Sequence, residues 1–423
     1  MRTWLFQILF LFVPTFVLAG ELSLDEAFRS ASHKSEILRQ SHEQVFQAGE
    51  RVNQARGELF PKISFETNHL IQPVPEDPIA QEFSPGQQTV ASLTAKQPLF
   101  RGLREFSGLK QQKYNLIAEE STQKQTVQGL YQNVALEFLN VLSFERDIKN
   151  LDEQIEIYSR RVSELQGSTK RGETSRTELL SSQSVQNSLR AELRLVQGQL
   201  KAARESFYST TGMPRESELK DPALVPKVIV DLNFYLKNIE NRPDIQIATA
   251  RRSASDEEIA IARGGHFPTF DAVGNYYFIR PGFLSDTKWD IALQFSLPIF
   301  SGGVIQSQVR EAASTNKQAD LEVARIRRLA EVEIRSFYEI LQARFDQLSI
   351  LTGSVKLAEK NVAVSENDFK RGLIRSIDVQ LALGEYRSSR RLLDQAYYSL
   401  QMDLIRLEVA SGLRPSGMSG SIL

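Results

Sequence analysis

Two hydrophobic periods alternate along the chain, one of three to four residues and one of two residues. The first helical stretch starts at Ser23, which has the spacing of a capping box with Glu26. It continues to Pro61, and a corresponding stretch runs from about residue 241 to Pro268. Since a proline inside a helix breaks it, the pattern predicts one continuous helix ahead of each of these two prolines.

Four stretches alternate apolar and polar side chains, which is the period of a β-strand. We predict strands at about 62–72, 88–98, 268–280 and 287–298. A tilted strand of a membrane barrel has this length, but half-buried strands of a soluble domain alternate in the same way, so the pattern alone leaves both open. The predicted junctions between strands and helices are prolines: Pro61, Pro98, Pro268 and Pro298.

After each pair of strands the period becomes helical and stays so for a long distance. Between Gly102 and Gly172 the chain has no proline, so a single helix there would extend roughly 100 Å at 1.5 Å per residue. Its apolar positions step by three and four: Val141, Phe144, Ile148, Leu151, Ile155, Tyr158, Val162 and Leu165. A helix of this length cannot bury its apolar stripe alone, so the pattern predicts packing partners along the whole helix.

The whole pattern occurs twice. The turn Lys-Arg-Gly at 170–172 recurs at 370–372, an offset of 200 residues, whereas the Phe-Pro pair at 60–61 recurs at 267–268, an offset of 207. We therefore predict a first repeat at 20–212, a linker or equatorial segment at 213–240, a second repeat at 241–412 and a C-terminal tail at 413–423.

The two long helical legs of each repeat meet in turns at about 166–176 and 369–377. Gly172 and Gly372 occupy the position of a left-handed C-cap, and Ser175 or Ser376 is a candidate N-cap for the returning helix. A Lys-Arg-Gly sequence explains helix termination by itself, since cations favour the C-terminal end of a helix dipole. Helix termination does not account for the same turn at the same distance in both repeats.

The N-terminus has the features of a cleaved secretion signal at 1–19, namely one positive charge, an apolar run at 4–18 and small or apolar residues up to Ala19. No later apolar stretch is long enough for a transmembrane helix, so any membrane crossing by the mature chain must use a barrel. The chain has no cysteine, which excludes disulfides and cysteine-bound metals. Its net charge of −1 argues against a nucleic-acid partner.

Catalytic and metal-binding patterns are missing from the sequence. It contains no nucleophile elbow or phosphate loop, and most carboxylates alternate with lysines and arginines on helix surfaces, which is typical of a solvated face. We predict that the chain is not an enzyme and needs no metal or cofactor. No metal-ligand spacing connects the four histidines, His33, His42, His69 and His266.

The order of these features resembles the TolC-like outer-membrane efflux family over essentially the whole mature chain. The features are the duplicated unit, the Phe-Pro entries to the strands, the strand exits at 97–103 and 297–303, the segment 241–245, and the turn 369–372 leading to 377–379. The resemblance implies a mainly α fold with a membrane β-barrel, to which each of three subunits gives four of twelve strands. Long antiparallel coiled-coil helices would form a tapered periplasmic tunnel.

The resemblance also implies the function and the partners. The chain would be a subunit of a homotrimeric channel in outer-membrane lipid, giving an exit duct to a tripartite efflux pump or a type I secretion system. Its turns would dock to a periplasmic adaptor (membrane fusion) protein and through it to an inner-membrane transporter. The implied adaptor contacts are Lys170, Arg171, Gly172, Glu173, Thr174, Lys370, Arg371, Gly372, Leu373 and Ile374.

Asp378 matches an acidic position that narrows the periplasmic entrance in the family's best-known member, and a ring of three carboxylates would repel anions and bind cations. Leu381 stands where that member has a second acidic residue, and Ile374 stands where it has an arginine, with Arg375 next to it. We therefore expect a gate around Asp378, Arg375 and Leu381 that closes differently, for example through a hydrophobic constriction. The alternative role of Asp378 is to favour the first turn of the returning helix.

A soluble periplasmic coiled-coil scaffold is the alternative function. It would explain the helical periodicity and the secretion signal. It would not explain paired strand segments flanked by prolines in both repeats.

Overall fold

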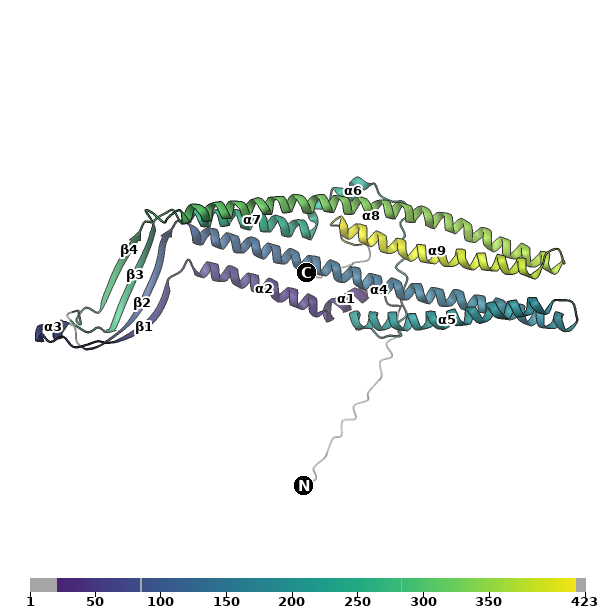
Figure 1. The fold of residues 1–423 in the computed structure, drawn as a ribbon, viewed down its shortest axis with the longest axis horizontal. Helices are drawn as coiled ribbons and strands as arrows, with labels where there is room; N and C mark the ends of the chain where they lie inside the picture. Colours follow the sequence, from purple (N-terminus) through teal and green to yellow (C-terminus); the bar gives the residue numbers. More distant parts are fainter. Residues whose placement is uncertain (1–20, 84–85, 283, 416–423) are drawn as a thin grey trace, which may run out of the picture.

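The computed structural model describes residues 21–83, 86–282 and 284–415, so the predicted secretion signal and most of the predicted tail lie outside it. The chain is elongated, with a sheet at one end and two helical hairpins that reach the other end (Figure 1). In chain order the elements are α1 (Leu24–Lys34), α2 (Glu36–Gly57), β1 (Lys62–Ile71), α3 (Pro78–Phe83), β2 (Gln87–Arg101), α4 (Arg104–Lys170), α5 (Arg176–Thr211), α6 (Leu232–Leu236), the 3-10 helix η1 (Ile239–Asn241), α7 (Pro243–Gly264), β3 (Thr269–Ile279), β4 (Trp289–Ser296), α8 (Val304–Lys370) and α9 (Ser376–Ala410).

The two repeats share one helical architecture. Helices α4 and α8 contain 67 residues each, which at 1.5 Å per residue is roughly 100 Å. Helices α5 and α9 return over 36 and 35 residues, and α2 and α7 contain 22 residues each. The duplicated, mainly helical fold predicted from the sequence is thereby confirmed.

The helix predicted between Ser23 and Pro61 is two helices, so that prediction was wrong. Helix α1 ends at Lys34, and Ser35 leaves the helical conformation with φ −58° and ψ 115°. The Ser35 hydroxyl accepts a hydrogen bond from the N–H of Leu38 (3.2 Å) and so caps α2. A serine cap is a local signal that hydrophobic periodicity does not contain.

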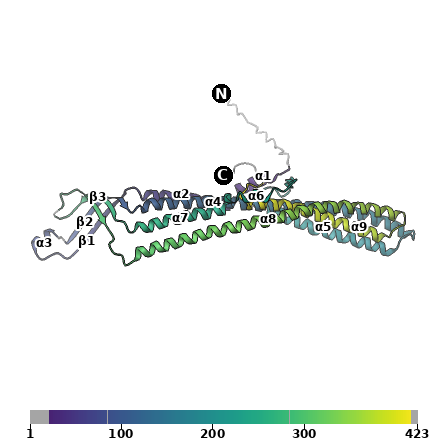
Figure 2. The ribbon, with the colours of Figure 1, turned by 90° about the horizontal axis from the view of Figure 1, so that it is seen from above.

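The helices form a layer whose edges are α8 on one side and α2 and α5 on the other (Figure 1, Figure 2). In the half next to the sheet, α4 packs between α2 and α7, and α7 packs against α8. In the half with the hairpin turns, α4 packs against α5 and α9, and α9 packs against α8. The contacts between α4 and α7 and between α4 and α9 therefore join the two repeats.

The sheet is antiparallel in the order β1-β2-β3-β4, so β2 and β3 also join the two repeats. Strand β2 passes through Pro98 to Arg101, and its register against β3 shifts next to Pro98, because proline has no N–H to donate to the ladder. The prediction that Pro98 marks a strand–helix junction was therefore wrong. Strand β4 ends ahead of Pro298, and the remaining prolines, Pro61 and Pro268, directly precede β1 and β3.

The sheet has one apolar and one polar face. On the first face, exposed apolar residues lie opposite one another on adjacent strands and form a row across the sheet: Phe65, Leu93, Tyr276 and Trp289. On the second face, polar residues lie opposite one another on adjacent strands and form a similar row: Ser64, Thr94, Asn275 and Asp290. Asn275 connects this polar row, since its amide oxygen accepts from the Thr94 hydroxyl (2.9 Å) and its amide nitrogen donates to Asp290 (2.8 Å).

The largest fully buried side chains belong to helices, and an aromatic pair marks the place where α1 meets α4. There the rings of Phe28 and Tyr131 pack edge to face with centroids 5.1 Å apart. The predicted linker at 213–240 contains α6 and the first two residues of η1, and its Tyr235 packs against Tyr338 of α8. None of the helices in the described part of the chain is both long and apolar enough to cross a membrane.

Two glycines bring the repeats together where the sheet meets the helices. Gly102 has φ +66°, and a Cβ atom added to it would lie 2.4 Å from the carbonyl oxygen of Gly264. A Cβ atom added to Gly264 would lie 2.3 Å from Arg104 Cγ and 2.9 Å from the carbonyl oxygen of Gly102. The backbones of the two repeats therefore approach each other more closely than any larger residue allows.

We expect Gly264→Ala to destabilise the folded protein by about 1–3 kcal/mol, the usual effect of overpacking. The matched control is Gly49→Ala in α2, where an added Cβ meets nothing within 4 Å and alanine raises the helix propensity. Thermal unfolding of the detergent-solubilised protein, followed by circular dichroism, measures both. An unchanged midpoint for Gly264→Ala would contradict the close approach.

Candidate functional site at the hairpin turns

The two hairpin turns have the same backbone geometry. Gly172 follows α4 with φ +77°, and Gly372 follows α8 with φ +76°. In both turns the residue after the glycine donates its N–H to the carbonyl five residues earlier, at 2.9 Å. These bonds are those of a Schellman motif, which requires a left-handed residue and so explains a glycine in each turn.

The side chains that follow the two glycines differ. Glu173 forms two bonds of 2.8 Å with the Arg171 guanidinium, and this hydrogen bonding lowers the pKa of the Glu173 carboxyl. In the second turn Leu373 takes the place of Glu173 and is 69% exposed. Arg371 forms no ion pair with any residue that the structure describes. The first turn is therefore polar with an internal ion pair, and the second is basic and apolar.

The other predicted adaptor contacts lie in the same two turns. Lys170 and Lys370 are exposed at the ends of α4 and α8. Thr174 is half-buried, and Ile374 packs against an apolar cluster between α4, α5 and α9. The two sets are contributed by one chain but by separate hairpins.

The predicted gate residues lie at the start of α9. The N–H of Arg375 donates to Asp378 Oδ2 (2.9 Å), so Asp378 caps the helix, and Arg375 Nε is 3.9 Å from the same oxygen. Leu381, about one turn further on, is 66% exposed. Asp378 thus has a structural role in a single chain, and that role leaves its carboxylate partly exposed.

The two serines proposed as N-caps have different roles. Ser175 does cap α5, because its hydroxyl accepts from the N–H of Thr177 (3.1 Å). Ser376 lies inside α9 and is fully buried, so its assignment as an N-cap was wrong. Its hydroxyl instead accepts a hydrogen bond from Arg161.

Arg161 of α4 is a buried cation that the sequence reasoning missed. Its Nη2 donates to the hydroxyl (2.6 Å) and the carbonyl (3.1 Å) of Ser376, and its guanidinium lies 4.9 Å from the centre of the Phe369 ring. Its Nε has no hydrogen-bond partner among the described residues, and burial lowers the pKa of Arg161. Arg161 therefore ties the second turn to the first hairpin.

Further polar contacts connect α9 to α4 and α5 of the first hairpin, and we call the whole set of polar contacts between the two hairpins the hairpin seam. The Gln380 amide donates to the Ser182 hydroxyl (2.6 Å), and Asp394 accepts from Asn150 (2.6 Å) and Arg146 (3.3 Å). The buried polar residues of α4 in the seam are Asp147, Asn150, Gln154 and Arg161. Their spacing of three, four and seven places them on one helix face, a pattern that the sequence alone does not distinguish from a solvated face.

Asp147 in this seam is buried, with only 9% of its surface exposed. It nevertheless has no hydrogen bond or ion pair with the residues that the structure describes. It lines a cavity of about 340 Å³ between α4, α5 and α9. Burial raises the pKa of Asp147, with smaller contributions from Asp394 and Glu192 and an opposing one from Arg391. Arg391 is already paired with Glu192 at 2.6 Å.

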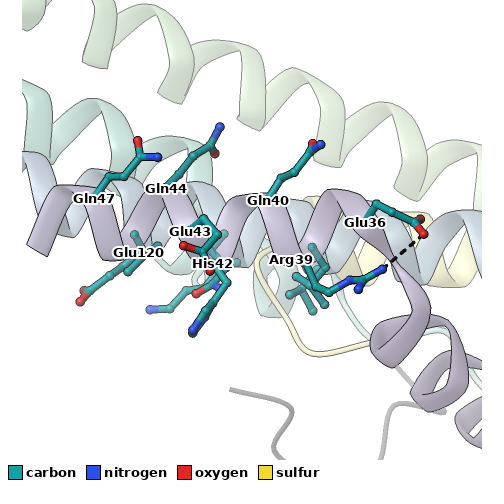
Figure 3. Close-up of a pocket in the computed structure, with 13 residues that line it drawn as sticks. Glu36, Arg39, Gln40, His42, Glu43, Gln44, Gln47 and Glu120 are labelled. Carbon is teal, nitrogen blue, oxygen red and sulfur yellow. Dashed lines mark hydrogen bonds and ion pairs between the residues drawn. The ribbon is translucent and has the colours of Figure 1, made fainter.

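An open groove of about 1210 Å³ runs along α2 and α4 (Figure 3). Gln40 and Gln44 point to one side of α2, whereas His42 points to the other, so the polar side chains do not converge. No group of three or more His, Asp or Glu residues that could hold a metal ion lies within 21–83, 86–282 and 284–415. The groove therefore presents separate polar side chains rather than a ligand cage.

Comparison with known proteins gives consistent matches. The sequence profile described as "Outer membrane efflux protein" matches residues 28–213 and 235–413. Outer membrane protein TolC of Salmonella enteritidis is 23% identical over 412 residues, which is 92% of this chain and 82% of TolC. Proteases secretion protein PrtF of Dickeya chrysanthemi is 25% identical over 178 residues, which is 40% of this chain and 38% of PrtF.

The fold is similar to that of solved channels. The open state of the Neisseria gonorrhoeae MtrE outer membrane channel superposes with a TM-score of 0.79 at 16% identity, covering 94% of this chain and 89% of MtrE. At this level of identity the likeness concerns the fold.

We expect Arg161→Ala to loosen the second turn, because it removes the two charge-assisted hydrogen bonds to Ser376, and a loss of about 1–2 kcal/mol raises the local opening equilibrium. Trypsin should then cut at Lys370 and Arg371 roughly fivefold faster, with no change at Lys170 and Arg171. Mass spectrometry of a digestion time course measures the four sites. Arg160→Ala, which removes the exposed neighbour, should leave all four cleavage rates unchanged. Wild-type cleavage rates at Lys370 and Arg371 in Arg161→Ala would show that Arg161 does not hold the second turn.

We expect Asp147→Asn to stabilise the protein at pH 8 by on the order of 1 kcal/mol, because the amide carries no buried charge. The pKa of Asp147 in the folded protein lies above its usual value of 3.8, so its contribution is fully favourable below pH 3.8 and is lost as the pH rises through the folded pKa. The difference between variant and wild type should therefore shrink from pH 8 to pH 4, which is close to the usual value. Asp152→Asn, an exposed neighbour on α4, is the control for thermal unfolding at both pH values.

Proposed function

The chain belongs to the outer membrane efflux protein family, and we propose that three copies of it form an exit duct through the outer membrane. The family assignment confirms the predicted resemblance, favours a channel over a soluble scaffold, and locates the protein in the outer membrane with its long helices in the periplasm. Its relatives are channel proteins, and the proposal assigns this chain no catalytic step.

The observation that carries the proposal is a sheet with one apolar and one polar face and with two open edges. The apolar face suits contact with outer-membrane lipid, and the polar row around Asn275 suits a water-filled interior. Free strand edges present backbone groups that must be paired within lipid. Three copies of the four strands would close into a twelve-stranded barrel and pair every edge.

The outer edge of the helical layer supports the same assembly. Helix α8 carries exposed apolar residues that recur at intervals of three, seven, eight or ten residues, which keeps them on one side of a helix: Leu321, Leu329, Val332, Ile340, Ile350, Leu357 and Val364. These side chains are all exposed in the single chain, so no described part of it covers them. The neighbouring subunit would bury the stripe along its whole length.

The two hairpin turns would meet a periplasmic adaptor protein, which in turn contacts an inner-membrane transporter. The turns project from the end of the chain opposite the sheet, and their Lys-Arg pairs and Leu373 are exposed (Figure 1). The likeness to PrtF supports type I secretion, and the likeness to TolC is equally compatible with an efflux pump.

The entrance between the turns would be gated at the start of α9. Asp378 of three subunits would form an acidic ring that favours cations. Ile377 and Leu381 are four residues apart on α9, and Leu373 lies in the turn before it. All three are exposed, so they would form an apolar constriction beside that ring. Arg375 stays near Asp378 and would moderate its charge.

Single-channel recording in planar bilayers tests the proposal. The signal-cleaved protein should give discrete channels that prefer cations, since three carboxylates line the entrance. Asp378→Ala should reduce the cation preference by about twofold or more, and Leu381→Ser should raise conductance in the closed state. The matched control Glu359→Ala changes an exposed carboxylate of α8 away from the turns and should leave both properties unchanged.

The results separate the duct from the gate. Channels that are indifferent to Asp378→Ala would restrict this residue to helix capping and leave the duct in place. Folded, detergent-solubilised protein without any channel activity would contradict the duct itself.

A further inference from the structure

The cavity beside Asp147 lies where α4 and α5 of the first hairpin meet α9 of the second (Figure 1). Its volume of about 340 Å³ is within the range of roughly 300–1,000 Å³ that is typical of sites for small molecules. Its lining combines charged, amide and apolar side chains from all three helices. A site of this kind is separate from the hairpin turns and from the sheet.

Three side chains in this cavity have charges or hydrogen-bonding groups that no other residue uses. Asp147 and Gln154 of α4 are 9% and 8% exposed, and neither side chain forms a hydrogen bond or ion pair with the described residues. Arg387 of α9 is half-buried and forms no ion pair with the described residues. Buried polar groups are normally paired, because an unmade hydrogen bond leaves the cost of removing the group from water uncompensated. One carboxylate, one amide and one guanidinium are therefore available to a bound molecule.

The other charges around the cavity are already paired. Arg391 lies 2.6 Å from Glu192, and Arg146 lies 3.3 Å from Asp394. Each pair is net neutral, so one carboxylate and one guanidinium remain unpaired. A ligand with only a positive or only a negative charge would be attracted by one of these two groups and repelled by the other.

We propose that the cavity binds a small zwitterion, with the ligand's ammonium at Asp147 and its carboxylate at Arg387 and Gln154. Gln154 follows Asp147 by seven residues, so the two lie on the same face of α4 with their Cα atoms about 10 Å apart along the helix axis. Two charge-assisted hydrogen bonds of about 2.8 Å each leave roughly 5 Å between the ligand's own charged groups. A γ-amino acid, whose ammonium and carboxylate are joined by three methylene groups, has this separation.

Apolar side chains complete the site. Leu151 of α4, Val196 of α5 and Leu392 of α9 line the same cavity and provide contacts for the methylene groups. The ligand thereby contacts both helices of the first hairpin and one helix of the second. Because it binds only the packed arrangement of the three helices, it stabilises that arrangement as its concentration rises.

Isothermal titration calorimetry with 4-aminobutyrate tests the site. The signal-cleaved protein is used in a maltoside detergent and phosphate buffer, since zwitterionic detergents and buffers would compete for the cavity. n-Butylamine and butyrate each lack one of the two charges of 4-aminobutyrate. Both should bind at least about tenfold more weakly, because each leaves one charged group of the protein without a partner.

Substitutions on two helices test the two ends of the ligand separately. Asp147→Asn and Arg387→Gln should each weaken the binding of 4-aminobutyrate by about tenfold or more. Asp147→Asn should also abolish the preference for 4-aminobutyrate over butyrate, whereas Arg387→Gln should abolish the preference over n-butylamine. The matched controls Asp152→Asn and Arg160→Gln change exposed residues of α4 outside the cavity and should leave all affinities unchanged.

Thermal unfolding followed by circular dichroism gives an independent measurement. The midpoint of the wild type should rise with the concentration of 4-aminobutyrate, and this rise should disappear in Asp147→Asn and in Arg387→Gln. The same scans establish that both variants are folded before their affinities are compared.

Three results would overturn the proposal. Wild-type protein that binds none of the three probes would exclude the site. n-Butylamine that binds as tightly as 4-aminobutyrate would indicate a site for a simple cation. Unchanged affinity for 4-aminobutyrate in folded Asp147→Asn and Arg387→Gln would show that the ligand binds elsewhere.

Discussion

One chain of this protein has edges that it cannot cover itself, and every larger feature depends on that constraint. A helix of 67 residues with an apolar stripe needs a neighbour along its whole length, and a four-stranded sheet has two rows of unpaired backbone groups. Within lipid each unpaired group costs several kcal/mol. Strand β4 leads into α8, and α2 leads into β1, so the free edges of sheet and helices are continuous (Figure 1). The proposed ring of identical chains would cover the apolar stripe of the helix and pair both free edges of the sheet.

The junction between sheet and helices couples the two parts mechanically. Gly102 and Gly264 allow close backbone contact there, and Arg101, directly before Gly102, makes two bonds of 2.9 Å to Asp271 across β2 and β3. Strand register and helix packing are therefore set at the same place.

The two hairpins are held together by both apolar and polar contacts. The apolar cluster around Leu151 and Leu189 includes Val379 and Leu383 of α9. Beside it, Ser376 of α9 accepts from Arg161 of α4 and Gln380 of α9 donates to Ser182 of α5, and Asp147 is left without a partner among the described residues. Buried polar contacts add little net stability when one group is unmatched. The start of α9, which carries the proposed gate, is thus joined to the first hairpin by apolar contacts that add stability and by polar contacts that specify position.

The sequence by itself determined the features that depend on neighbouring residues. The capping box of Ser23 and Glu26, the strand periodicity, the length of α4 and the left-handed turn glycines all follow from local sterics and hydrogen bonding. Only the tertiary structure decided that Asp147 and Arg161 are buried, that Ser376 accepts from Arg161 and that β2 continues through Pro98. Each of these depends on an element far away in the sequence: α9 for Asp147 and Arg161, α4 for Ser376, and β3 for the continuation of β2. A polar face that repeats every three to four residues is the same in sequence whether water or another helix covers it.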